Sequence, residues 1–105
     1  YEDIDLSKRA AQLGMKRVLL NDWHCIHNYG GASRRNISTT ILTKSEVIIS
    51  SHKYIQKHFG GAAKLLAHSF IFTTTFLELG LLSLFSKVKR GMFKKLLGYW
   101  FGAKA

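Results

Sequence analysis

Four side chains of types that bind metals or act as nucleophiles lie in one short stretch, namely Asp22, His24, Cys25 and His27. Their spacing matches neither the paired C-x-x-C nor the H-x-x-x-H pattern of structural zinc sites. A cysteine and a histidine could act as a nucleophilic pair only in a fold that brings them together, because adjacent residues rarely face each other. We therefore interpret this stretch as a polar and aromatic loop that packs on a partner.

Two further ionisable residues, His68 and Glu78, are the only ones between Lys64 and Lys87. Proton transfer by Glu78 would need a chain of ionisable groups. On a helix, His68 lies about 80° around the axis and roughly 15 Å along it from Glu78, which is too far for a relay. The sequence therefore favours a packing role for Glu78, neutral or paired, and hydrogen bonding over haem ligation for His68.

Other catalytic patterns are not apparent in the sequence. Paired catalytic carboxylates, glycine-rich phosphate loops, serine–histidine–acid sets and nucleophile elbows are all missing. We expect no enzyme activity and no small-molecule substrate. No cofactor is expected either, and a bound phospholipid such as cardiolipin is the one candidate ligand.

Composition limits the class of protein. The chain has 105 residues, no proline, one cysteine and a net charge of +10. One cysteine excludes an internal disulfide framework, and the lack of proline suits long helices. The charge is uneven, with a net of +2 in residues 1–42 and +8 in residues 43–105. The basic groups thus belong mainly to the second half of the chain.

The longest apolar stretch predicts a membrane span. The 22 residues between Lys64 and Lys87 contain no Lys, Arg, Asp, Asn, Gln or Pro. A helix of this length is roughly 33 Å long, enough to cross a hydrocarbon core of about 30 Å. The expected fold is all-α with one transmembrane helix at about 62–86. The alternative is a buried helix of a soluble protein, although a short chain has few elements with which to cover it.

One or two helices are expected before the span. The first runs from residue 3 to 20 with Asp5 as its cap, and irregular chain follows over 21–36. The second begins at a capping box formed by Thr43 and Glu46 and continues to Phe59. A strand over 39–49 is the alternative, because this region is rich in β-branched residues. Gly60 and Gly61 are expected to stop or bend the helix.

One stripe of the predicted span is suited to helix packing. Small side chains separated by three residues let a second helix approach closely, and a polar group can hydrogen-bond across the contact. On a helical wheel these features fall together. The predicted packing residues are Ala63, Ala67, Thr74 and Glu78.

The basic tail after the span, residues 87–105, predicts an amphipathic helix at the membrane interface. Val88, Met92, Leu96 and Ala103 share one side of the wheel, and most cations lie opposite. Cations and amphipathic aromatic rings both favour the headgroup region. The alternative is a basic tail packed on a neighbouring protein. The predicted lipid-contacting residues are Lys87, Lys89, Arg90, Lys94, Lys95, Tyr99 and Trp100.

The predicted organisation has three parts. Residues 1–60 form an extramembrane helical and irregular arm, residues 61–86 the transmembrane helix, and residues 87–105 the interfacial tail. Basic residues are more numerous after the span than before it. The positive-inside rule therefore places the C-terminus on the cytoplasmic or matrix side.

This layout resembles the small single-span accessory subunits of mitochondrial inner-membrane complexes. The matching features are the span with Glu78, the Gly60–Gly61 bend before it, and the basic stretch 87–95 after it. Membrane-stalk subunits of ATP synthase look similar in their small residues, intramembrane glutamate and basic, glycine-containing tail. The resemblance implies a structural subunit in the mitochondrial inner membrane, part of ATP synthase or the respiratory chain, whose partners are other membrane subunits and anionic lipids.

Two other classes of function stay open. The net charge of +10 favours an RNA-associated protein of an organellar ribosome. The uncharged run 65–77 argues against it, because RNA contacts need basic residues along every segment. The amphipathic tail alone favours a membrane-active peptide. Neither alternative accounts for the apolar stretch and the basic tail together.

Overall fold

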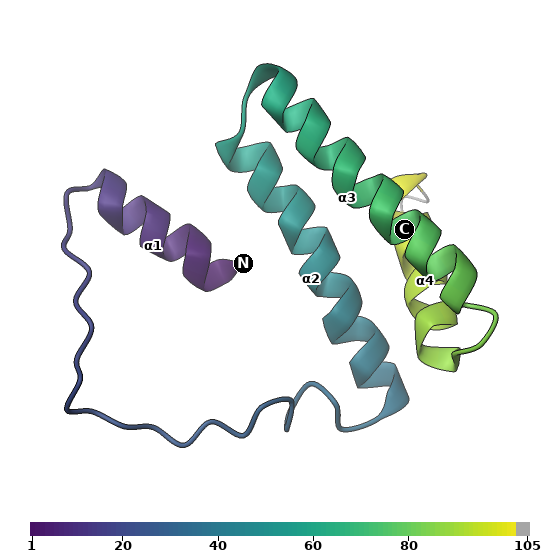
Figure 1. Cartoon of the computed structure of the whole chain (residues 1–105), viewed down its shortest axis with the longest axis horizontal. Coiled ribbons are helices and arrows are strands. Elements are labelled where there is room, and N and C mark those ends of the chain that lie inside the picture. Colours follow the sequence, from purple (N-terminus) through teal and green to yellow (C-terminus); the bar gives the residue numbers. More distant parts are fainter. Residues whose placement is uncertain (103–105) are drawn as a thin grey trace.

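The computed structural model describes residues 1–102, which form four helices (Figure 1). They are α1 (Glu2–Gln12), α2 (Ile37–His58), α3 (Gly61–Leu82) and α4 (Lys87–Trp100). No strand occurs in residues 1–102, which confirms the all-α prediction; the strand considered for 39–49 lies inside α2. Residues 103–105 of the predicted tail lie outside the described residues.

Helix α1 is shorter than the predicted 3–20 and begins at Glu2, with Tyr1 instead of Asp5 at the N-cap position. Gly14 ends it with a φ of +74°. The Gly14 amide donates to the carbonyl of Ala11, and the Met15 amide to that of Ala10. This pair of bonds is a Schellman motif, which glycine favours because it lacks a Cβ. The chain then continues over 13–36 without regular structure, and nearly all of its side chains are exposed.

Helix α2 begins six residues before the predicted capping box at Thr43, so that prediction was wrong. The Asn36 side chain caps it, because its Oδ1 accepts from the Thr39 amide at 2.8 Å. Thr43 lies inside the helix and donates to the Thr39 carbonyl at 2.9 Å. The end of α2 is as expected: the helix stops at His58, and Gly61 adopts a φ of +50°.

Helix α3 ends at Leu82, before the predicted limit of 86. Residues 83–85 form a turn, and Ser86 caps α4 by accepting from the Lys89 amide at 3.4 Å. Helix α3 is long and apolar enough to cross a membrane. It is the one such helix in the described residues.

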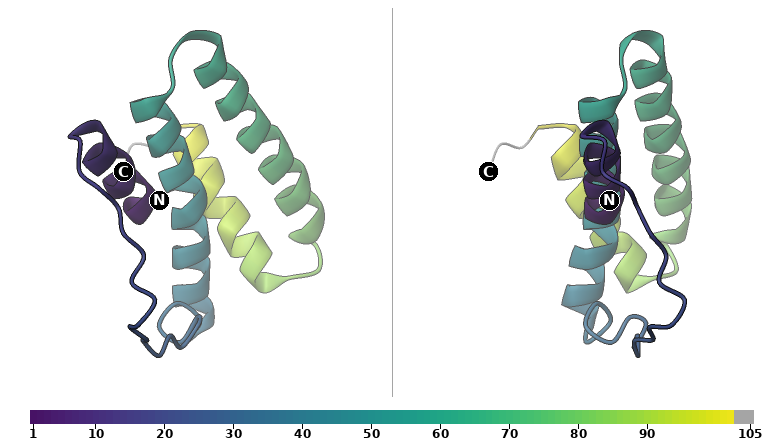
Figure 2. Two further views of the ribbon diagram at one scale, coloured as in Figure 1. Left: turned by 60° about the vertical axis from the view of Figure 1, so that its left-hand side comes forward. Right: turned by 90° about the vertical axis from the view of Figure 1, so that its left-hand side faces the viewer.

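Helices α2, α3 and α4 pack together, whereas α1 lies on the far side of α2 (Figures 1 and 2). Helix α3 returns alongside α2 after the short Gly60 connection, and α4 turns back against both. The buried core consists of Ile49 from α2, Leu79 from α3, and Met92 and Leu96 from α4. Half-buried apolar residues around this core are Ile41, Ile48, Val88, Phe93 and Trp100.

Small residues let α4 approach α2 closely. Ser45 on α2 is fully buried, and a Cβ placed on Gly91 of α4 would overlap the side chain of Ile41. The C-terminal part of the predicted extramembrane arm is therefore packed against both the predicted span and the basic tail. The chain thus has one three-helix bundle, to which α1 is added.

Candidate functional site

The side of α3 that faces away from the bundle is apolar and exposed. Leu66, Phe70, Leu77 and Leu81 have exposed fractions of 68%, 70%, 67% and 65%. Their spacing of four, seven and four residues places them in one stripe along the helix. We call these four residues the outer face of α3. Exposed Thr73 and Thr74 lie between Phe70 and Leu77. Exposed apolar side chains gathered on one side of a helix are typical of a surface that contacts lipid or another protein.

The predicted packing residues lie beside this outer face. Ala63, Thr74 and Glu78 are exposed, and Ala67 is half-buried. The Thr74 hydroxyl donates to the backbone carbonyl of Phe70 at 2.8 Å, and not to the side chain of Glu78. The stripe is therefore available to a second helix, and its role in packing stays a prediction.

Glu78 is paired within the chain. Lys89 Nζ of α4 lies 2.6 Å from Glu78 Oε1. This ion pair joins the C-terminal part of α3 to the first turn of α4. It also balances the one acidic charge on α3, which lowers the cost of placing this segment in a membrane.

Several of the predicted lipid-contacting cations are engaged in the bundle. Lys95 pairs with Glu46 at 3.0 Å, and Arg90 Nε donates to the Ser83 carbonyl at 3.0 Å. Lys87 and Lys94 are exposed and form no ion pair within residues 1–102. Contact of the predicted residues with lipid stays a prediction, and Lys87 and Lys94 are the cations most available for it.

The two predicted interfacial aromatic residues differ in surroundings. Tyr99 is 41% exposed. Trp100 is half-buried, with its ring centroid 4.9 Å from that of Phe72 and 6.4 Å from that of Phe76. Trp100 thus contributes to the contact between α3 and α4.

A polar chain that the sequence did not predict lies at this contact. Trp100 Nε1 donates to His52 Nε2 at 3.1 Å, and the Nδ1 atoms of His52 and His68 lie 2.8 Å apart. His52 is only 6% exposed. Burial lowers the pKa of His52, and the neighbouring His68 lowers it further. These residues border an open hollow of about 310 Å³, lined also by Ser69, Phe72 and Phe101.

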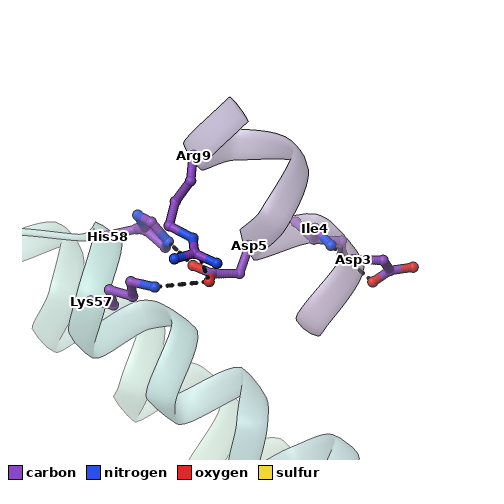
Figure 3. Close-up of polar contacts among 6 residues, drawn as sticks. All are labelled: Asp3, Ile4, Asp5, Arg9, Lys57 and His58. Atoms are coloured by element: carbon purple, nitrogen blue, oxygen red, sulfur yellow. Dashed lines mark hydrogen bonds and ion pairs between the residues drawn. The ribbon is translucent and has the colours of Figure 1, made fainter. Parts of the chain in front are cut away.

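A second polar cluster joins α1 to the end of α2 (Figure 3). Asp5 accepts from Lys57 Nζ at 2.8 Å and lies 2.5 Å from His58 Nε2. Arg9 Nε lies 3.3 Å from the same carboxylate. The hydrogen bonds from Lys57 and His58 lower the pKa of Asp5 to about 2, with smaller contributions from the charges of Lys57 and Arg9. The rings of Tyr1 and Tyr54 add a contact at 5.5 Å.

The potential metal ligands of the sequence, Asp22, His24, Cys25 and His27, lie exposed in the segment 13–36. Within residues 1–102, no three histidine, cysteine or acidic side chains lie close enough to hold a metal ion. The structure therefore does not gather these four residues into a site.

Comparison of the chain with models of protein families, with curated proteins and with solved structures finds no match. Support for a function therefore comes from the molecule itself. Two features carry it: the exposed outer face of α3 and the cationic side chains of α2 and α4.

Proposed function

We propose that this chain is a non-catalytic accessory subunit of an energy-transducing inner-membrane complex, held in the membrane by α3. The observation that carries the proposal is the outer face of α3, which is long, mostly apolar and uncharged. Burial of one large apolar side chain contributes about 1.5–3 kcal/mol. Four such side chains, each about two-thirds exposed, would contribute roughly 4–8 kcal/mol on transfer to lipid or to an apolar helix.

The opposite side of α3 supports a position at the edge of a complex. Helices α2 and α4 cover this side, and both carry exposed lysines, including Lys53 and Lys94. Charged side chains at membrane depth face protein or water, because hydrocarbon solvates them poorly. We infer that the outer face of α3 meets lipid or a neighbouring membrane helix. The α2 and α4 side meets water or polar surfaces of other subunits.

The small-residue stripe gives the partner helix a place to dock. Ala63 and Ala67 leave room for close approach, and Thr74 is exposed beside them. Glu78 with its Lys89 partner adds a neutral ion pair at the edge of this stripe. The proposed partner is therefore an apolar membrane helix of another subunit.

The proposal includes binding of anionic lipid headgroups by Lys87 and Lys94. Each cation near an anionic membrane surface contributes about 1 kcal/mol, and the effect falls with salt. Cardiolipin carries the negative charge that would suit this pair of side chains. The C-terminal, basic end of the bundle is then expected on the matrix side.

The finer assignment to ATP synthase or to the respiratory chain is supported by the resemblance of layout. A short basic chain, the Gly60–Gly61 connection, Glu78 in the apolar helix and the basic stretch after it are the features in common. One observation argues against an RNA-associated role. The outer face of α3 carries no cation that could contact phosphate.

Alkaline extraction of membranes that contain the tagged full chain tests the proposal. We expect the protein to stay in the membrane pellet and to migrate with a large complex in native electrophoresis. Leu77→Lys places a charge on the outer face and should move the protein to the supernatant. The matched control is Val47→Lys, since Val47 is 59% exposed on α2. It should remain in the pellet.

Two results would contradict the proposal. One is release of the unchanged protein by carbonate. The other is an equal effect of both lysine substitutions, because the outer face would then have no special role. Release together with ribosomal particles would favour the RNA-associated alternative.

A further inference from the structure

The hydrogen bond from Trp100 fixes the protonation of two histidines. An indole nitrogen is a donor only, so His52 Nε2 must accept and carries no proton. The neutral imidazole of His52 then has its proton on Nδ1. That proton is donated to His68 Nδ1, which in turn must accept and keep its own proton on Nε2.

The geometry of the histidine pair fits one shared hydrogen bond. The two ring planes differ by only 15°, and the ring centroids lie 5.1 Å apart while the Nδ1 atoms lie 2.8 Å apart. The rings thus meet nitrogen to nitrogen in nearly one plane instead of lying face to face. This arrangement leaves room for one proton between the nitrogens and none for a metal ion, whose bonds to two imidazoles are each about 2.0 Å.

We propose that His52, His68 and Trp100 form an acid-sensitive latch, which holds the C-terminal turn of α4 while both imidazoles are neutral and releases it when either gains a proton. When a proton from solvent binds His52 Nε2, the new N–H faces the N–H of Trp100 Nε1. Two donors cannot bond each other, so the hydrogen bond to Trp100 breaks. A proton that binds His68 Nδ1 opposes the N–H of His52 Nδ1, so His52 keeps a hydrogen bond to His68 only by moving its own proton to Nε2, which again breaks the bond to Trp100. Each added proton therefore costs one of the two hydrogen bonds.

The surroundings of the pair are neutral and mostly aromatic. From α3 the pair meets Ser69 and Phe72, and from α4 it meets Tyr99, Trp100 and Phe101. No carboxylate of residues 1–102 lines this hollow.

No ion pair within residues 1–102 involves either histidine. Lys64 lies one turn before His68 on α3, and Lys53 follows His52 on α2. The carboxylates of the bundle are bonded elsewhere, Glu46 to Lys95 and Glu78 to Lys89. Asp5 of α1 is bonded to Lys57 and His58. Burial keeps the pKa of His52 below its ordinary value of 6.5. The latch is therefore closed at neutral pH and opens only below pH 6.5.

Opening uncovers an aromatic surface. Trp100 covers Phe72 and Phe76 in the closed state, so its departure frees apolar rings on both α3 and α4. The core residues Leu96 and Met92 lie one and two turns before Trp100 on α4 and hold the rest of that helix in place. The latch thus acts on the end of α4, and it does not require the proposed membrane role.

The first test is the tautomeric state, read by ¹⁵N nuclear magnetic resonance of the imidazoles in the full chain in detergent micelles. At pH 7.5 we expect His52 to be protonated on Nδ1 and His68 on Nε2. Free imidazole side chains favour the Nε2 form, so the result for His52 is distinctive. His52 protonated on Nε2 would overturn the proposal without any mutation.

The second test follows opening with pH. Trp23→Phe removes an indole that is 78% exposed and leaves Trp100 as the only tryptophan. We expect the emission of Trp100 to change with a midpoint below pH 6.5. Hydrogen exchange of residues 97–102, corrected for the intrinsic effect of pH, should rise by up to about tenfold per pH unit, as expected for one linked proton.

Substitutions decide whether the histidines cause the transition. His52→Gln keeps an acceptor for Trp100 but cannot be protonated, so the transition should shrink, and it should vanish when His68→Gln is added. His58→Gln is the matched control on α2, since His58 bonds Asp5 and not Trp100, and it should leave the transition intact. A transition that persists in the double variant would refute the latch.

Discussion

Two leucines on α3 allow the packed bundle to be tested by the same substitution at two sites. Leu79 is 1% exposed in the core, whereas Leu77, two residues earlier, is 67% exposed on the outer face. Leu79→Ala leaves a cavity among Ile49, Met92 and Leu96, and such substitutions cost about 2–5 kcal/mol. Leu77→Ala leaves no cavity, so it should change the free energy of unfolding by less than about 0.5 kcal/mol.

Thermal unfolding of the full chain in micelles, followed by circular dichroism, measures this difference. For a chain of this size, 1 kcal/mol corresponds to a shift in Tm of about 4–8 °C. Leu79→Ala should therefore lower the Tm by more than about 8 °C, and Leu77→Ala by less than about 4 °C. In membrane extraction the order is reversed, since Leu77 contributes to the outer face. Equal losses of Tm would refute the reasoning, because α3 would then have no buried side.

Three further predictions concern α4, α2 and α1. Gly91→Ala should lower the Tm because its Cβ overlaps Ile41, whereas Gly98→Ala has open space and should gain up to about 1 kcal/mol of helix stability. Ser45→Ala should raise the free energy of unfolding by about 1 kcal/mol, because the buried Ser45 hydroxyl has no hydrogen-bond partner within residues 1–102. Contact of α1 with α2, measured by hydrogen exchange of α1, should persist above pH 4 and be lost as the pH falls towards 2. Asp5 has a pKa lowered from 3.8 to about 2 and contributes only while ionised.

Each of these predictions has a control. Gly98→Ala serves for Gly91→Ala, and a larger loss at Gly98 would contradict the packing of α4 on α2. Ser51→Ala removes a hydroxyl that donates to the Ile48 carbonyl at 2.6 Å, so it should not stabilise. Asp3→Asn changes a carboxylate that makes no ion pair with α2 in the described residues, and it should leave the docking of α1 unchanged, unlike Asp5→Asn.

Much of the helical content could be read from the sequence, but not all of its limits. The start of α2 was missed because Thr43 and Glu46 match a capping box, while Asn36 forms a cap earlier in the chain. The earlier cap extends the helix by residues that pack on α4, and this tertiary contact outweighs the local signal. The end of α1 had a local signal in Gly14, which the Schellman motif uses.

The arrangement of α4 could not be read from its amphipathic pattern. A helix with one apolar face has the same pattern whether that face meets a membrane or another helix. Met92 and Leu96 in fact meet α2 and α3. The side of α3 that faces the bundle could not be predicted either, because apolar residues occur on all sides of this helix and only Leu79 is fully buried.

The hydrogen bonds that link Trp100, His52 and His68 could not be predicted from the sequence. Its members are separated by 48 and 16 residues, and no spacing rule links them. The cluster at Asp5 likewise joins residues 52 and 53 positions apart. Such sites depend on how helices dock, which cannot be read from the spacing of residues in one sequence.

The segment 13–36 tethers α1 to the bundle, so α1 binds α2 as an intramolecular ligand. Fully extended, this segment would reach about 80 Å. A tether of this kind gives a local concentration in the millimolar range. A contact of only about 4 kcal/mol then keeps α1 half-docked, since that free energy corresponds to a dissociation constant near 1 mM. A protein with a better site for α1 could therefore draw it away from Lys57 and His58 while the three-helix bundle stays folded.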